Sequence, residues 1–360
     1  MSQIRLGLDG KQIEVEPHTT LLQAAHQHGI EIPTLCHDDR LDPYGGCRLC
    51  LVEVDGAPRP VAACKTVCAD NMTVRTHSDD LHRLRRTMLD MLMAEHYEDV
   101  GVKPNQLQEL AAEHQLVQPS LKLGRRAAYD DRNQWIGFNP GACIMCDRCV
   151  RYCDEVMQCS ALEHVGQGVG AVVQPTGRKS FLDTSCELCG GCVSTCPTGA
   201  LYEKQAIVKR GEEVVLGGGG PIADAECEKT RSVCTFCGVG CVLDLNTKDG
   251  KVVKVTSDIG VGPNEGNLCN KGKFAFEFIH HSDRLTEPLV RGADGELHVT
   301  SWDDALQKVA AGMNGVKQRS GPDAIGFLAS SRCTNEDVYI VQKIARAAIG
   351  TNNVHSCAAT

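Results

Sequence analysis

Cysteine is the residue that stands out in this chain: 21 of its 360 residues are cysteines, and most of them fall into four spaced groups. Four thiolates of one chain can hold either a zinc ion or an iron–sulfur cluster. The first group has the spacing C-x10-C-x2-C-x13-C. Two glycines before the close central pair let the backbone curl around the sulfur atoms, and the outer gaps are wider than in a zinc ribbon. We therefore expect a 2Fe–2S cluster, with zinc as the alternative, on Cys36, Cys47, Cys50 and Cys64.

The second and third groups are an internal repeat with the spacing C-x2-C-x2-C-x3-C. This is the run of the bacterial two-cluster ferredoxins, in which three close thiolates hold one 4Fe–4S cluster and the fourth cysteine reaches the other. The ligand sets are therefore expected to be crossed: Cys143, Cys146, Cys149 with Cys196, and Cys186, Cys189, Cys192 with Cys153.

The fourth group, C-x2-C-x3-C-x27-C, can hold a third 4Fe–4S cluster or zinc on spacing alone. Its two internal glycines again allow the backbone to approach closely. The candidate ligands are Cys234, Cys237, Cys241 and Cys269.

Several other candidate ligands fit less well. We expect Cys68 to be structural, Cys159 to be a small buried residue and Cys227 to be a bystander. His96 could ligate a cluster only with cysteines just downstream, and none lies between Cys68 and Cys143, so we expect an ordinary helix-end residue. No Walker loop, G-x-G-x-x-G turn, G-x-S-x-G elbow or H-E-x-x-H pair occurs.

Composition limits the compartment and the partners. The formal net charge is −9 and no basic tract occurs, which argues against a nucleic-acid surface. No apolar run approaches the roughly eighteen residues needed to cross a bilayer. The N-terminus lacks an export signal, so the many cysteines indicate metal binding in a reducing cytoplasm rather than a disulfide scaffold.

The segments around the cysteines show local structure. Apolar and polar residues alternate over positions 1–16 on both sides of Asp9-Gly10, and this pattern predicts a hairpin. Thr19 or Thr20 is expected to cap a helix through Gln27, and a second helix is expected over 78–96. After residue 300 we expect a helix over 302–316, a strand over 324–328 and a helix over 336–349, and we find no parallel neighbour for that strand.

The predicted fold class is modular α+β. We expect a β-grasp 2Fe–2S ferredoxin-like domain, a helical connector, a domain with two 4Fe–4S clusters, a Gly-rich linker, a small 4Fe–4S domain and an incomplete α/β start. In the same order, these segments are residues 1–77, 78–137, 138–205, 206–226, 227–285 and 286–360.

The order of these segments resembles the catalytic subunit of molybdenum- or tungsten-dependent formate dehydrogenases, and the N-terminal half is similar to the large iron–sulfur subunit of complex I. The resemblance is carried by CTFCGVGC, GNLCNKGKFAFEFIHHSDRLTEPLVR and SSRCTNEDVYIVQKIARAAIGTNNVHSCA. It implies a 4Fe–4S cluster on the fourth cysteine group and a bis-pterin guanine dinucleotide holding Mo or W in the full-length parent. It also implies that Lys271 lies between that cluster and the pterin, as an electron relay.

The resemblance further implies that electrons from formate pass through the clusters to a flavin/NAD-reducing or hydrogenase-type subunit. In the family the metal-binding cysteine or selenocysteine follows the segment resembling TNNVHSCA, so Thr360 would directly precede it. We expect a selenoprotein whose translation is cut at that codon, and a chain deliberately ended there would look the same; in either case we expect no formate activity of its own. The alternatives are a complex I-like or stand-alone electron carrier and a zinc-stabilised docking protein.

Overall fold

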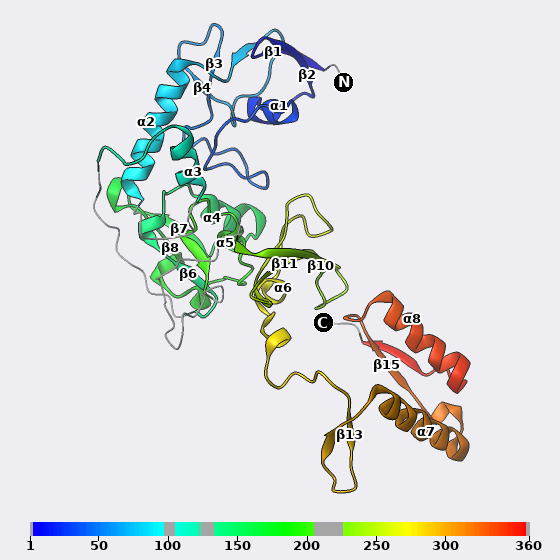
Figure 1. The fold of residues 1–360 in the computed structure, drawn as a ribbon. Helices are drawn as coiled ribbons and strands as arrows, with labels where there is room; N and C mark the ends of the chain where they lie inside the picture. Colours follow the sequence, from blue (N-terminus) through cyan, green and yellow to red (C-terminus); the bar gives the residue numbers. More distant parts are fainter. Residues whose placement is uncertain (1–2, 97–104, 122, 124–132, 205–225, 358–360) are drawn as a thin grey trace. The chain divides into compact units, whose positions relative to one another are not determined.

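The structure is a computed structural model that describes residues 3–96, 105–121, 123, 133–204 and 226–357 (Figure 1). The chain divides into two compact units, Met1–Glu228 and Lys229–Thr360. All but the last residue of the expected linker 206–226 lies outside the described residues. Within the described ranges, no helix combines the length and apolar character that a membrane span requires.

The N-terminal domain is a five-stranded sheet with the order β2-β1-β5-β3-β4, and one helix packs on it. The predicted hairpin is present, because Leu8 of β1 pairs with Lys11 of β2 and both turn residues have positive φ. Strand β1 also pairs in parallel with β5, which completes the β-grasp topology. The elements are β1 (Ile4–Leu8), β2 (Lys11–Val15), α1 (Leu21–Gln27), β3 (Leu51–Val54), β4 (Val61–Ala62) and β5 (Thr73–Arg75).

Local signals explain why both helices that follow this hairpin form where the sequence predicts. Thr20 caps α1 through a capping box with Gln23. Ser78 caps α2 (Asp79–Glu95) by accepting from the backbone N–H of Leu81, and two aspartates favour its positive end. A shorter helix, α3 (Gln106–Glu113), contacts α2.

The region after residue 133 consists of short elements around the two repeated cysteine groups. Strands β6 and β9 form one antiparallel pair, and β7 and β8 form another. Each cysteine group contains one helical turn, which carries its third cysteine, and the first turn continues as a π-helical turn over Tyr152–Val156. The elements are β6 (Ile136–Phe138), α4 (Arg148–Arg151), β7 (Leu162–Val165), β8 (Val172–Pro175), α5 (Gly191–Ser194) and β9 (Leu201–Glu203).

The second unit begins with a three-stranded sheet in the order β10-β11-β12, and α6 packs on β12. Buried Leu243, Val255, Leu268 and Phe276 form its core. The elements are β10 (Glu228–Val233), β11 (Val242–Lys248), β12 (Lys251–Thr256) and α6 (Asn270–Phe274).

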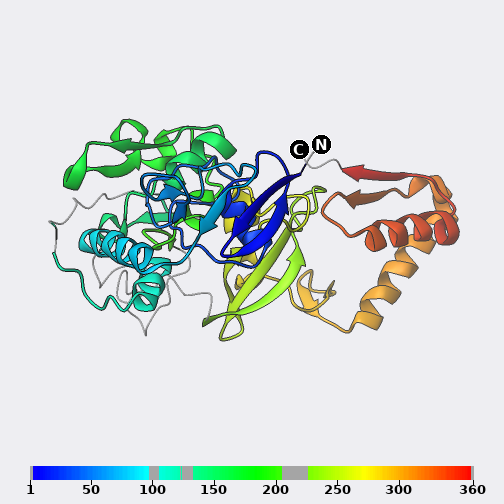
Figure 2. The same ribbon diagram turned by 90° about the horizontal axis from the view of Figure 1, so that it is seen from above.

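The last segment is sparse. It contains a hairpin, two helices and one parallel strand pair, and α8 contacts β15 (Figures 1 and 2). Two expectations were wrong here. The strand begins at Phe327, because a 3-10 turn occupies Pro322–Ala324, and it does have a parallel neighbour, β16. The elements are β13 (Leu289–Arg291), β14 (Leu297–Val299), α7 (Trp302–Ser320), β15 (Phe327–Ser330), α8 (Asn335–Lys343) and β16 (Val354–Cys357), with a π-helical turn over Ile344–Ile349.

Candidate iron–sulfur sites

The first cysteine group lies on the loop between α1 and β3 and on the segment after β4. Cys36, Cys50 and Cys64 are almost fully buried. The backbone N–H of Cys47 donates to Cys36 Sγ at 3.4 Å, and that of Leu35 donates to Cys47 Sγ at 3.5 Å. A hydrogen bond from the Cys47 thiol, together with backbone donors, lowers the pKa of Cys36 to about 5. Backbone donors of this kind stabilise thiolates, which are the form that binds iron.

Gly45 shows why glycine precedes the close pair. Its φ is +73°, and a Cβ there would lie 3.1 Å from the Lys65 side chain and 3.9 Å from Cys64 Sγ. The left-handed backbone at this position favours glycine, and any side chain there would press on that of Lys65, which follows the candidate ligand Cys64.

The internal repeat of the sequence is also a repeat of backbone conformation. Met145 and Leu188, at equivalent positions, both have φ +53°, and each donates its N–H at 3.4 Å to the first cysteine of its own group. Asp147 and Gly190 are likewise both left-handed. Two loops that share these turns present the same cradle of N–H groups to sulfur.

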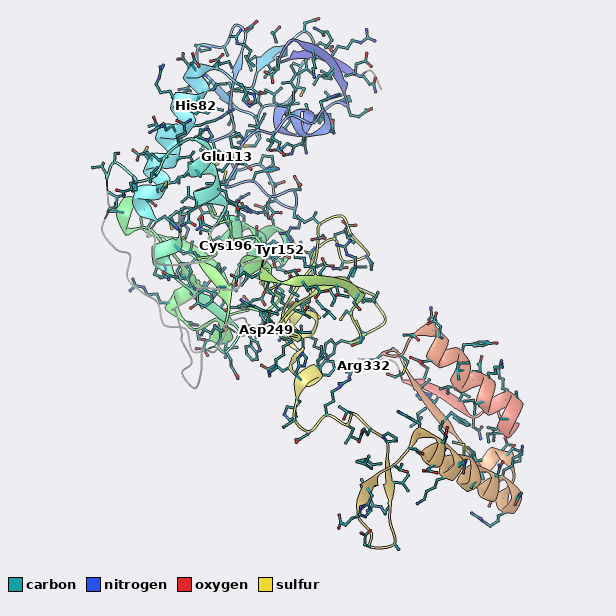
Figure 3. All side chains as sticks on the ribbon, viewed as in Figure 1. His82, Glu113, Tyr152, Cys196, Asp249 and Arg332 are labelled. Carbon is teal, nitrogen blue, oxygen red and sulfur yellow. The ribbon has the colours of Figure 1, made fainter. Side chains whose placement is uncertain are left out.

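The cysteines of the repeat lie close enough together to affect one another's pKa values. Burial raises the pKa of Cys149 well above its usual value, and the charges of Cys146, Cys143 and Cys196 raise it further, ahead of any cysteine of the other triplet. Cys196 is labelled in Figure 3. Burial also raises the pKa of Cys192 well above its usual value, and the charges of Cys189, Cys186 and Cys153 raise it further.

The first and second sites share an apolar cluster. It includes Leu35 and Leu49 from the loop of the first site and Ile144 from the second, and the partly buried Cys47 and Cys146 pack against it. One candidate ligand from each site therefore contacts the same packed side chains.

A buried ionic network joins the same two sites. The side chain of Asp38, only 1% exposed, accepts from Arg40 at 2.9 Å, from Arg148 at 3.1 Å and from Thr195 at 2.7 Å. Arg148 and Thr195 each precede a candidate ligand of the Cys143 site. In addition, Arg151 donates at 2.6 Å to the carbonyl oxygen of Cys36.

The fourth group forms in the second unit around the start of β11 and the start of α6. Burial raises the pKa of Cys241, and the charges of Cys234, Cys237 and Cys269 raise it further, so all four thiols lie near one another. The N–H of Cys234 donates to the carbonyl of Cys241 at 2.8 Å, which closes the loop. A Cβ on Gly272 would lie 3.6 Å from Cys234 Sγ.

These donor sets fit clusters better than single ions. A tetrahedral zinc site holds its sulfur atoms within about 4 Å of each other. In the described part of the chain, no three His, Cys, Asp or Glu side chains converge tightly enough for one ion. Sets of four thiols are the ligands that iron–sulfur clusters take.

Family models match successive segments of the chain. They are a 2Fe-2S iron-sulfur cluster binding domain over residues 1–79, the ferredoxin-like domain of NADH-quinone oxidoreductase subunit 3 over 135–202, the molybdopterin oxidoreductase Fe4S4 domain over 227–281 and molybdopterin oxidoreductase over 284–360. The last two of these matches, over residues 227–281 and 284–360, are to domains of molybdopterin oxidoreductases. The expected modular α+β fold class is confirmed.

The individual proteins that this chain is similar to differ in their names. It is 35% identical over 98% of its length to the α subunit of an NADPH-Fe(3+) oxidoreductase of Geobacter sulfurreducens, and covers 40% of that protein. It is 32% identical over 97% of its length to a Staphylococcus aureus protein named "Putative formate dehydrogenase", and covers 38% of it. The chain therefore spans about two fifths of these relatives. A chain of an NAD+-reducing [NiFe]-hydrogenase is 28% identical with a TM-score of 0.50; the match covers 62% of this chain and 97% of that one.

Two lysines of α6 differ in their surroundings. Lys271, the residue expected between cluster and pterin, has an exposed side chain. Lys273 is 2% exposed and donates from Nζ to the carbonyl of Val255 at 2.7 Å. The family resemblance that singles out Lys271 gave no sign that the buried ammonium of this helix belongs to Lys273.

Two other residues lie closer to the sites than the sequence predicts. His96 is the C-cap of α2, as expected of a helix-end residue, but its side chain is buried and its Nδ1 lies 3.1 Å from the carbonyl oxygen of Ala142, next to Cys143. Cys159 is half-buried, and its Sγ lies 3.3 Å from that of Cys153. By contrast, Cys68 is buried in the core of the first domain, as expected.

Proposed function

We propose that the chain is the electron-transfer portion of the α subunit of a molybdenum- or tungsten-dependent formate dehydrogenase. It would hold one 2Fe–2S cluster and three 4Fe–4S clusters on the sixteen cysteines described above. When bound, these clusters supply one-electron redox steps that connect a pterin-bound metal with an NAD-reducing or hydrogenase-type partner.

The observation that carries the proposal is the contact between the first two sites. Cys47 and Cys146 pack on one apolar cluster, and Asp38 fixes the loop of the first site to residues beside two ligands of the second. A protein that used cysteines only for structural zinc would gain nothing from fixing two sites at one rigid contact. The contact also orders the relay: the 2Fe–2S site neighbours the Cys143 site.

The chain's own residues have defined roles in this proposal. Backbone N–H groups hold the thiolates in their charged form, and the apolar cluster excludes water between the first two sites. Exposed Lys271 is available to contact a pterin, which resemblance to the family assigns to it. The residue that binds the catalytic metal, and most of the pterin cleft, belong to a part of the parent outside these 360 residues.

A second candidate function is a relay for electrons from NADH or NADPH. The match to a chain of an NAD+-reducing [NiFe]-hydrogenase favours this function. It covers 97% of the hydrogenase chain but only 62% of this chain. In that case the N-terminal unit would serve as the electron carrier and formate would not be a substrate.

Anaerobic assays of the full-length protein separate the two candidates. The formate proposal expects formate to reduce a viologen dye, and expects no such activity from the 360-residue chain alone. Dye reduction by NADH or NADPH but not by formate would contradict the formate proposal and support the second candidate. Formate activity of the 360-residue chain alone would contradict the assignment of the catalytic metal to the rest of the parent.

A further inference from the structure

Arg85 interrupts the buried face of α2. Leu81 and Leu89, one helical turn to either side, are both fully buried, and Arg85 between them is only 4% exposed. It borders a pocket of about 1050 Å³, but with so little exposed surface its charge is poorly screened by solvent. Burial lowers the pKa of Arg85, which shows that its charge is held at a cost.

The guanidinium of Arg85 is bound to the loop of the first cysteine site. Nε donates to the carbonyl oxygen of Leu49 at 3.1 Å, and Nη2 donates to those of Leu51 at 2.9 Å and Thr76 at 2.8 Å. Leu49 and Leu51 are the residues on either side of Cys50. These carbonyls satisfy N–H donors but carry no net charge.

No carboxylate of the described residues forms an ion pair with Arg85. The charges of Cys50 and Asp9 affect it electrostatically, and both oxygens of Asp9 are already bound by Thr76. A buried cation without a charged partner is strongly unfavourable. A 2Fe–2S cluster on four thiolates is net negative, and one electron more negative when reduced, so it would compensate this charge.

We propose that Arg85 is the buried counter-charge of the 2Fe–2S centre and raises its reduction potential. The geometry favours the more negative, reduced state because the cation is fixed beside Cys50 before any electron arrives. This inference rests on the proposed 2Fe–2S site and assigns a positioning role, not ligation, to Arg85.

The test is a redox titration of the anaerobically reconstituted chain, in which the 2Fe–2S signal is followed by EPR. At the wild-type midpoint, Arg85→Gln is expected to lower the reduced-to-oxidised ratio about tenfold, a shift of roughly 59 mV for one electron. Arg85→Lys keeps the charge and should shift less. Arg83→Gln makes the same charge change on an exposed position of α2 and should not shift. The 4Fe–4S signals of each sample serve as internal references.

An Arg85→Gln protein that titrates like the wild type would overturn the inference while leaving the 2Fe–2S site intact. Loss of the 2Fe–2S signal from the wild type itself would instead refute the site. Should Arg85→Gln not take up its cluster, the stabilities of the apo-proteins decide. A counter-charge role predicts that Arg85→Gln destabilises the apo-protein no more than Arg85→Lys does, because the apo-protein lacks the anion that the charge compensates. A clearly larger cost of Arg85→Gln than of Arg85→Lys in the apo-protein would show a purely structural role.

Discussion

The hydroxyl of Thr195 donates a 2.7 Å hydrogen bond to the carboxylate of Asp38, across 157 positions of sequence. Asp38 lies two residues after Cys36, and Thr195 lies directly before Cys196. This bond therefore joins the neighbours of two candidate ligands that belong to different clusters. Two clusters exchange electrons only when they are held close, so the contact makes the two sites one functional unit.

Removal of the Asp38 carboxylate should loosen that unit. Asp38→Ala leaves Arg40 and Arg148 as buried cations without their partner, and the expected loss of stability is about 3–5 kcal/mol. Thermal unfolding of the reconstituted chain measures this loss. Asp39→Ala is the matched control, because Asp39 is 70% exposed and should change little. Equal effects of both variants would contradict the assigned role of the network.

Crossed ligation makes a prediction about pairs of cysteines. The double variant Cys143→Ser/Cys196→Ser removes two ligands of one cluster and should lose about four irons, whereas Cys186→Ser/Cys196→Ser affects two clusters and should lose about eight. Iron analysis of the reconstituted proteins measures the difference. The reverse order of losses would mean that each group of four binds its own cluster.

Lys271 and Lys273 should respond differently to the same change. Lys273→Met removes a buried ammonium from its carbonyl partner and is expected to change the stability of the second unit by about 1–3 kcal/mol. Lys271→Met should leave stability unchanged, because the side chain is exposed, and should slow formate-dependent dye reduction in the full-length protein. Thermal unfolding measures the change in stability, and the dye assay measures the change in formate-dependent reduction. Slower dye reduction by Lys273→Met but not by Lys271→Met would move the relay role to Lys273.

His114 predicts a loss of stability in mild acid. Its ring stacks on that of His82 with centroids 5.0 Å apart. Among the groups that affect the pKa of His114, Arg85 is a nearby cation and Glu113 is the only acid. Burial first, then His82 and Arg85, lower the pKa of His114, so the folded form binds a proton less readily than the unfolded one. The free energy of unfolding should therefore fall as the pH drops below about 6.5. Denaturant titrations at pH 7 and pH 6 should show a smaller fall for His114→Gln; an identical fall would remove His114 as the cause.

Local structure was predictable from sequence because its causes are local. Thr20 and Ser78 cap the helices that they precede, and Asp9-Gly10 closes the hairpin that it suggests. The spacing of the cysteines likewise named groups that the structure brings together.

The contacts between distant segments were not predictable in the same way. Nothing in the sequence around Asp38 indicates Thr195, and nothing in the stripe of α2 indicates that Arg85 faces inward rather than into solvent. The parallel partner of β15 was missed because Val354–Cys357 is too short to stand out as a strand. Lys271 and Lys273 differ in burial, and burial depends on how α6 packs against β12. The spacing of residues in the sequence does not specify that packing.

The iron and acid-labile sulfide content of the anaerobically reconstituted chain tests the central claim most directly. Four clusters on sixteen cysteines predict about fourteen irons and about fourteen sulfides per chain, with 2Fe–2S and 4Fe–4S EPR signals after reduction. A colourless protein that contains zinc and no sulfide would contradict the account.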